Sequence, residues 1–506
     1  MDRRNFMRTG GLAIAGAMAL PSFARSLAKE ESLSSVAAAK QHFGVTDADI
    51  RKTLEAALER GGDYADLFFE HTFNNSVGLQ DGAVNRTSSN VDFGMGVRVL
   101  SGDQSGYAFV ENVTLDEMLR AARTAARIAN STTKVAPVSL TERPIKDNFH
   151  PVLKPWEEVA VSQKMPYIQR LNDKIMSLDP RVQRVTVGLN DTTSHILFCN
   201  SEGVTYYDYR PMVTLNASCV MEENGQIQTG RSSRGFRKGF EFVTDDIIDL
   251  MARETVDSGD ILFKAITPRG GSMPVVFGAG ASGIFLHEAI GHAFEADFIR
   301  TNQSIYSDML NKKICNENVT VVDNPTVAFN RGSLNIDDEG IYGKNTTIVE
   351  NGVLTSFLHD RISAKHFGIE PTGNGRRQSF RHIAIPRMTV TYMLGGNMAE
   401  ADIIASVNEG IYVDSFTNGQ VQIGAGDFTF FVRSGYLIEN GKLTQPIKDV
   451  NIIGNGPRAM SDVTMVANNL EIDNGTWTCG KAGQGVPAGM GMPSILVSSL
   501  TVGGSS

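Results

Sequence analysis

The stretch Gly283–Phe294, which reads GIFLHEAIGHAF, places two histidines and a glutamate inside an apolar run. Imidazoles bind Zn²⁺ well, and a carboxylate beside the first ligand can accept a proton from water at the metal. A single histidine in such a run is usually an ordinary core residue. Two histidines and a glutamate within six residues favour a metal site, because a buried glutamate is costly without a partner.

The spacing of the two histidines differs from the familiar zinc-protease pattern. His287 and His292 are five residues apart, whereas H-E-x-x-H separates its histidines by four. Four steps along an α-helix rotate a side chain by about 40° and five steps by about 140°, so a regular helix would turn these imidazoles apart. Gly291 can permit a bulge or a helix end that brings them together. The segment therefore either breaks its helix or is not a zinc motif.

Other segments carry recognisable motifs, which are HEAIGHAFEAD (287–297), GNGRRQSFRHIAIPRMTVTYMLGG (373–396), GYLIENGKLTQPIKDVNIIGNGP (435–457) and CGKAGQGVPAGMGMPSILVSSLTVGG (479–504). Weaker motifs lie at YADLFFE (64–70) and GMGVRVLSG (94–102). Together these segments resemble the TldD/PmbA family of metallopeptidases, and the resemblance spans most of the chain.

This resemblance implies a ligand set. In the catalytic branch of the family, zinc is held by both histidines of H-E-x-x-x-H and by a cysteine near the C-terminus. Here these residues are His287, His292 and Cys479, with one zinc per chain and Glu288 as the general base. Three protein ligands and one open position are usual for catalytic zinc. Without the likeness, Cys479 would be interpreted as a buried free thiol. The sister branch of the family lacks these ligands.

Four more residues are candidates for roles around the centre. Arg381 and His382, in an Arg-His-x-x-x-Pro-Arg segment, are candidates for contact with substrate or with the oxyanion, and a surface or packing role is the alternative. Glu295 and Asp297 follow His292 closely. They can orient a metal ligand from behind or cap loop groups.

The N-terminus predicts export. Met1–Ala28 contains the pair Arg3-Arg4, an apolar run over Leu12–Leu20 and then small residues, which is typical of a twin-arginine signal peptide. The apolar run is much shorter than the roughly 20 residues that span a bilayer. A disordered basic start or an uncleaved anchor is the alternative. We expect the periplasm or cell envelope as the location, and no stable membrane span.

Composition argues against a nucleic-acid-binding protein and against a small disulfide-rich protein. The net charge of −9 leaves no basic footprint for nucleic acid, and 41% hydrophobic residues permit real cores. A chain of 506 residues is longer than one hydrophobic core usually supports, so we expect two or three domains. Four cysteines are too few for a disulfide scaffold, although a Cys199–Cys219 bridge across a hairpin is conceivable.

Periodicity predicts an α+β chain of three domains. After the signal peptide (1–28), an N-terminal helix and sheet domain (29–134) and a linker (135–156) precede a middle antiparallel α+β domain (157–265) and a β-rich C-terminal domain (266–506) that carries the metal helix Gly283–Phe298. In the first domain we expect helices at Asp47–Arg60 and Thr114–Ser131, and separate strands at Tyr64–Phe73, Val77–Gln80, Asp92–Val99 and Gly106–Phe109. In the middle domain we expect helices at Glu157–Ser177 and Asp245–Asp257, and separate strands around Arg184–Thr192, His195–Asn200, Thr205–Tyr209 and Val213–Glu222.

The resulting hypothesis is a zinc-dependent peptidase acting on short or unfolded peptides. Two alternatives stay open: a non-hydrolytic peptide-binding or assembly protein with a structural zinc, and a zinc amidase acting on a non-peptide envelope substrate. The resemblance also implies a dimer, either of two copies or with a homologue that lacks the motif.

Overall fold

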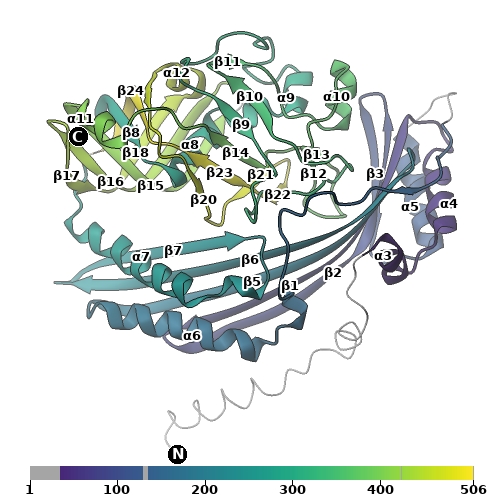
Figure 1. The fold of residues 1–506 in the computed structure, drawn as a ribbon, viewed down its shortest axis with the longest axis horizontal. Coiled ribbons are helices and arrows are strands. Elements are labelled where there is room, and N and C mark those ends of the chain that lie inside the picture. The colour runs from purple at the N-terminus through teal and green to yellow at the C-terminus, as the bar shows by residue number, and fades with distance from the viewer. Residues whose placement is uncertain (1–34, 129–134, 423, 505–506) are drawn as a thin grey trace, which may run out of the picture.

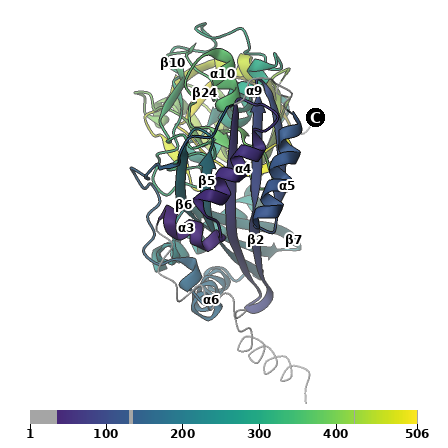
Figure 2. The same cartoon turned by 90° about the vertical axis from the view of Figure 1, so that its right-hand side faces the viewer.

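The structure is a computed structural model that describes residues 35–128, 135–422 and 424–504. The expected signal peptide therefore lies outside the described residues. Figure 1 shows two layers, a long twisted sheet with helices below it and the C-terminal half above it. Figure 2, turned by 90°, shows α3, α4 and α5 together at one end of the sheet. The prediction of a mixed α+β chain with a β-rich C-terminal domain is confirmed.

The N-terminal and middle parts of the chain share one antiparallel sheet. Strand β1 pairs with β5 from Asp66 opposite Asn200 to Gln80 opposite Thr186, which joins the strands that we expected in two separate domains. The short β4 (Thr141–Glu142) runs parallel to β6. The long strands are β1 (Tyr64–Gln80), β2 (Ala83–Ser101), β3 (Gln104–Val110), β5 (Val182–Asn200), β6 (Val204–Glu223) and β7 (Gln226–Phe236).

Several strands that we expected to be separate are continuous, because the polar residues between them pair with polar residues of the neighbouring strand. We predicted a break after Phe73, where three polar residues follow in sequence. In the structure, Asn75 Nδ2 donates to Asp191 Oδ1 at 3.0 Å, and Asn74 Oδ1 accepts from Thr192 Oγ1 at 2.8 Å. Polar side chains on neighbouring strands thus satisfy one another, and β1 and β5 each run through without a break.

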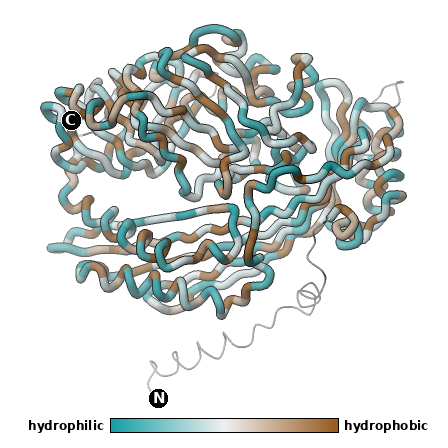
Figure 3. The backbone as a smooth tube through the Cα atoms, in the orientation of Figure 1, coloured by the Kyte–Doolittle hydropathy of each residue, from teal (hydrophilic) through white to brown (hydrophobic). Residues whose placement is uncertain are grey.

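All five long helices of this half cover the same face of the sheet. Alternate strand residues such as Leu67, Val187 and Leu215 point towards them, because successive side chains in a strand face opposite sides. Figure 3 shows hydrophobic and hydrophilic residues alternating along these helices, as expected for elements with one buried side. The helices are α3 (Val36–Phe43), α4 (Asp47–Ala57) and α5 (Leu115–Ala125) at one end, with α6 (Val161–Leu178) and α7 (Asp245–Lys264) at the other.

The C-terminal half contains a closed ring of strands. The pairing order β15-β8-β24-β18-β16 returns to β15, and β17 (Lys442–Ile447) and β19 (Val463–Val466) attach to this ring. The ring strands are β8 (Gly271–Phe277), β15 (Glu409–Gln422), β16 (Asp427–Glu439), β18 (Val450–Asn455) and β24 (Ile495–Gly503). A six-stranded sheet packs beside it, made of β9 (Val321–Asp323), β10 (Thr346–Glu350), β11 (Val353–Leu354), β14 (Val390–Met393), β20 (Glu471–Asp473) and β23 (Gly489–Met492).

Short elements complete this half. Strands β12 (Gly375–Arg376) and β13 (Ile385–Pro386) pair with each other, as do β21 (Thr478–Lys481) and β22 (Gln484–Pro487). The short helices outside the candidate metal segment are α10 (Arg361–Phe367), α11 (Glu400–Ala405) and α12 (Gly456–Ser461). In the described part of the chain, no helix is both long and apolar enough to cross a membrane.

All four cysteines are free and buried, so the conceivable Cys199–Cys219 bridge is absent. The register of β5 and β6 explains why. Cys199 lies opposite Thr205, whereas Cys219 lies opposite Val185 at the far end of the same ladder. A disulfide needs Cα atoms less than about 7 Å apart, which this register does not allow.

Candidate metal centre

The histidine segment breaks its helix, as the spacing of its histidines requires for a shared metal, and is therefore not one continuous helix over Gly283–Phe298. It begins as α8 (Gly283–Leu286), continues as the π-helical turn η5 (His287–Gly291) and the 3₁₀ turn η6 (His292–Phe294), and ends with α9 (Ala296–Arg300). The backbone N–H of His292 donates to the carbonyl of His287, five residues earlier. This wider turn places residues five apart on one face. The two imidazole centroids lie 4.9 Å apart, so the spacing is compatible with one ion.

Gly291 is needed for packing rather than for an unusual backbone angle. Its φ of −57° is ordinary for a helix. A Cβ at this position would lie 2.4 Å from Met388 Sδ, closer than atoms can approach. The absence of a side chain lets the π turn sit directly against the segment that contains Met388.

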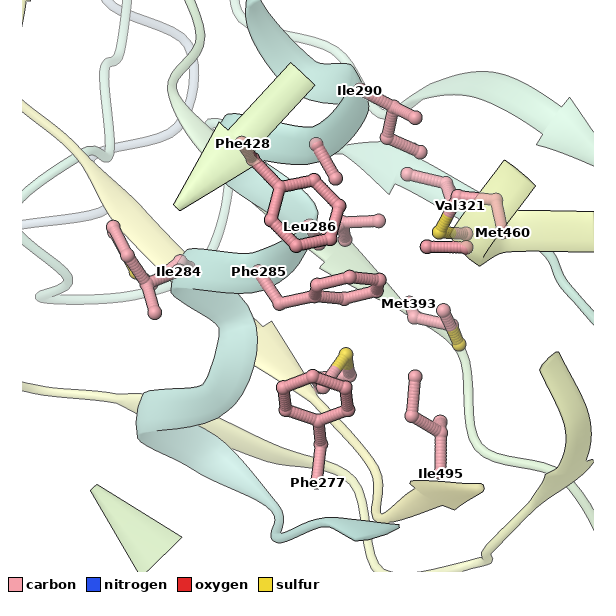
Figure 4. Close-up of a cluster of buried hydrophobic side chains, with 14 of the residues drawn as sticks. Phe277, Ile284, Phe285, Leu286, Ile290, Val321, Met393, Phe428, Met460 and Ile495 are labelled. Atoms are coloured by element: carbon pink, nitrogen blue, oxygen red, sulfur yellow. The ribbon is translucent and has the colours of Figure 1, made fainter. Parts of the chain in front are cut away.

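Apolar neighbours hold the π turn in the core. Phe285, Leu286 and Ile290 are fully buried, and Figure 4 shows them among the side chains that surround the segment. The Phe285 ring stacks on Phe277 with centroids 4.7 Å apart and meets the edge of Phe428 at 5.7 Å. Close packing on this scale fixes the direction in which the neighbouring histidines point.

The candidate third ligand comes from a tight hairpin. Cys479 lies on β21, and the turn to β22 is formed by Ala482 and Gly483, both with positive φ, as a two-residue type I′ turn requires. Cys479 Sγ lies 3.4 Å from His292 Nε2. One potential ligand atom from each of His287, His292 and Cys479 lies within 4.8 Å of the others, and all three residues are buried.

Electrostatics favour the ligand form of the cysteine. Burial alone would raise the pKa of Cys479, but the two imidazoles beside it reverse this effect and hold that pKa well below its usual range. Burial lowers the pKa values of the histidines. Cys479 beside His287 and Glu295 beside His292 outweigh burial, so both pKa values are raised. Two imidazoles and one thiolate fit the usual donor set of a three-ligand zinc centre.

Glu295 holds His292 from behind, as the sequence suggested. Its Oε2 lies 2.9 Å from His292 Nδ1, which leaves Nε2 directed at Cys479. Burial would raise the pKa of Glu295, but Lys481 and His292 lower it to about 2, so the carboxylate stays charged. A carboxylate in this position fixes the tautomer and orientation of a ligand histidine.

A cavity of about 190 Å³ lies beside the cluster. Glu288 lines it together with His287 and Cys479, so a carboxylate, two potential ligands and space for a substrate group meet at one place. Ile284, Gly419, Trp477, Ala488 and Met490 give the cavity an apolar part of its wall, and Asn418 and Thr478 are the other polar lining residues. Apolar walls with few polar groups are typical of substrate sites.

Arg381 and His382 contact residues that do not line this cavity. Arg381 pairs with Asp92 at 3.1 Å and Glu111 at 2.8 Å, and His382 Nδ1 lies 3.0 Å from Ser379 Oγ. Neither residue is among those that line the cavity. Their contact with substrate stays a prediction.

Sequence reasoning missed Lys481, which lies 3.1 Å from Glu295 and 2.7 Å from Asp297. A signal was present, because residues two apart on a strand share a face and Cys479 precedes Lys481 by two. Arg387, which donates to the Cys479 carbonyl, ends the Arg-His-x-x-x-Pro-Arg segment, but sequence reasoning assigned no role to it. The sequence pattern alone does not bring it to the site.

Known proteins resemble this chain over most of its length. Models of the PmbA/TldA metallopeptidase domain 1, central domain and C-terminal domain match residues 65–129, 154–258 and 270–504. A metalloprotease TldD homolog of Buchnera aphidicola is 36% identical over 90% of this chain and 96% of its own length. A zinc metalloprotease TldD homolog of Saccharolobus solfataricus is 28% identical over 90% of this chain and 99% of its own.

Solved structures share the fold. A putative modulator of DNA gyrase from Thermotoga maritima has a TM-score of 0.72 at 20% identity, covering 90% of this chain and 100% of its own. TldE from Thermococcus kodakarensis has a TM-score of 0.68 at 18% identity, with the same coverage. The three matching domains and the extended identity to TldD homologs show that the chain belongs to the TldD/PmbA family of metallopeptidases.

Proposed function

We propose that this protein is a zinc-dependent peptidase with His287, His292 and Cys479 as the zinc ligands and Glu288 as the general base. The observation that carries the proposal is the convergence of three buried ligand atoms within 4.8 Å, next to a cavity that Glu288 also lines. The Saccharolobus relative is named a zinc metalloprotease, which supports the choice of metal.

The bound zinc would supply Lewis acidity, which activates a water molecule and polarises the scissile carbonyl. Glu288 follows His287 in the chain and lines the cavity, so its carboxylate can accept the proton of the attacking water. The same carboxylate then returns a proton to the leaving amine. Glu295 keeps His292 oriented throughout, because its carboxylate accepts from the imidazole Nδ1–H.

The substrates that we propose are short or unfolded peptides. A cavity of about 190 Å³ holds one side chain and the peptide bond beside it rather than a folded surface. Recognition of an extended peptide through its main chain, in the manner of an added strand, tolerates many side chains. We therefore expect modest sequence preference.

Metal content tests the ligand set. Purified mature protein is expected to hold one zinc per chain, and His287→Ala, His292→Ala and Cys479→Ala are each expected to lose most of it. Elemental analysis after gel filtration measures the ratio. Cys315→Ala is the matched control, since Cys315 is also a buried free thiol but lies outside the cluster. Full zinc in Cys479→Ala would mean that the third ligand is another residue.

Assembly is the second prediction. We expect a dimer, either of two copies or with a homologue that lacks the H-E-x-x-x-H motif, because the family likeness implies that a second subunit supplies some of the walls of the site. Its interface should bury more than about 1,000 Å², the area that marks a specific contact. The existence of a TldE of the same fold is consistent with such a partner. Light scattering that finds an active monomer at assay concentration would contradict this prediction.

Export is the third prediction. Arg3-Arg4→Lys-Lys is expected to trap the protein in the cytoplasm, because the twin-arginine route requires the arginine pair. Cell fractionation followed by immunoblotting measures the distribution. Arg8→Lys is the control within the same segment and is expected to be exported normally. If the Lys-Lys variant reached the periplasm as efficiently as the wild type, the twin-arginine route would be excluded.

A further inference from the structure

Lys481 is a buried cation that makes two hydrogen bonds and one further ion-pair contact near the candidate metal centre. Its Nζ lies 2.7 Å from Asp297 Oδ1, 3.1 Å from Glu295 Oε2 and 3.0 Å from the carbonyl oxygen of Pro386. The side chain is 5% exposed, and the ammonium lies 4.4 Å from the centre of the Phe298 ring. An ammonium has three donors, so this environment fixes its position.

The position of Lys481 also fixes that of Cys479. Both residues belong to the four-residue strand β21, two positions apart, and both are buried on the same side of it. Cys479 and His292 come from segments 187 residues apart, so nothing in the local chain brings them together. The contact between Lys481 and Glu295 connects the two segments, because the Glu295 carboxylate also binds Nδ1 of His292.

Arg387 reinforces the same link from a third segment. It is fully buried, and its guanidinium donates to the carbonyl of Cys479 and, at 3.4 Å, to that of Gln484 across the hairpin. Its Nε lies 3.9 Å from Glu295 Oε1. The Glu295 carboxylate therefore faces His292 and two cations. Lys481 belongs to the hairpin that carries Cys479, and Arg387 donates to two carbonyls of that hairpin.

We propose that Lys481, supported by Arg387, is a positioning residue that fastens the Cys479 hairpin to the Glu295 carboxylate and so assembles the three ligand atoms before metal binds. The inference rests on the proposed function in taking zinc as the bound ion. Without this link, the ion would have to order two separate segments as it binds, and that ordering would weaken its affinity. Loss of an outer contact of this kind typically weakens metal binding by about 10- to 100-fold.

The test is the zinc affinity of the metal-free chain, measured by competition with a chromophoric chelator. Lys481→Met is expected to bind zinc about 10- to 100-fold more weakly than the wild type. Lys481→Arg keeps the charge and is expected to recover part of the affinity. Lys164→Met is the matched control, because Lys164 is also buried, pairs with Asp191 and lies near a Trp156 ring, but sits on α6. Its zinc affinity is expected to equal that of the wild type.

A double-mutant cycle isolates the contact itself. Glu295→Gln keeps the shape of the side chain but removes its charge. If Lys481 acts through Glu295, the double variant loses less affinity than the product of the two single losses. Losses that multiply, or an unchanged affinity in Lys481→Met, would overturn the proposal. If Lys481→Met does not fold, as judged by circular dichroism, an unchanged affinity in Glu295→Gln would overturn it instead. A wild type that binds no zinc would refute the proposed function and this inference with it, whereas a wild type that binds zinc and an equal affinity in Lys481→Met would refute the link alone.

Discussion

The Glu288→Gln variant is expected to keep its zinc while kcat on an unfolded peptide falls by about 10²- to 10⁴-fold. Glutamine has nearly the same shape, but its amide cannot accept the proton of an attacking water. Glu288 lines the cavity with His287 and Cys479, yet it is not one of the three clustered ligands, so its loss should spare the metal. Peptide digestion kinetics and zinc analysis of the same sample measure both effects.

A control variant distinguishes loss of the general base from a nonspecific effect of the substitution on activity. Glu350→Gln makes the same change at an exposed position on β10, and wild-type kcat is expected. Comparable peptide hydrolysis by Glu288→Gln would remove Glu288 from the mechanism. Zinc-loaded wild type that cleaves no peptide would favour a structural zinc. Cleavage confined to non-peptide amides would favour an amidase.

Much of the candidate site could be predicted from the sequence because its parts lie in short motifs. His287, Glu288 and His292 fall within six residues, and the resemblance drew attention to Cys479, which the fold brings to them. The five-residue spacing of the histidines also needed a structural explanation. A regular helix would have separated the imidazoles, and the chain solves this with one π turn whose hydrogen bond joins residues five apart.

The rest of the site depends on contacts between distant segments. Lys481 meets Glu295 only because the β21–β22 hairpin folds onto the end of the histidine segment, and Arg387 reaches the same carboxylate from the segment after β13. Strand periodicity places Lys481 on the same face as Cys479, but it does not encode the contact with Glu295. The strands show a related limit, since the polar residues 74–76 indicate a loop when considered alone. They form the middle of a strand because β5 offers polar partners at the matching register.

A fully buried ion pair joins the N-terminal sheet to the C-terminal half. Arg98 on β2 donates to Asp66 Oδ2 on β1 through Nε at 2.8 Å, and to Glu339 Oε1 of the C-terminal half through Nη1 at 2.6 Å. All three side chains are 0% exposed. Asp66 also faces Arg377 at 3.3 Å. Each charge in this buried cluster is stabilised by the opposite charges beside it, because water does not reach the side chains.

Arg98→Met is expected to lower the free energy of unfolding by about 3–5 kcal/mol, since it leaves two carboxylates buried with incomplete compensation. Urea-induced unfolding, compared at equal m-values, measures the change. Arg51→Met is the control, because Arg51 pairs with Glu55 on the surface of α4 and its loss should cost less than about 0.5 kcal/mol. Adding Glu339→Gln to Arg98→Met is expected to restore part of the stability, because a neutral amide costs less to bury than a carboxylate. A loss below about 1 kcal/mol in Arg98→Met would mean that Arg377 and the surrounding backbone compensate these carboxylates without Arg98.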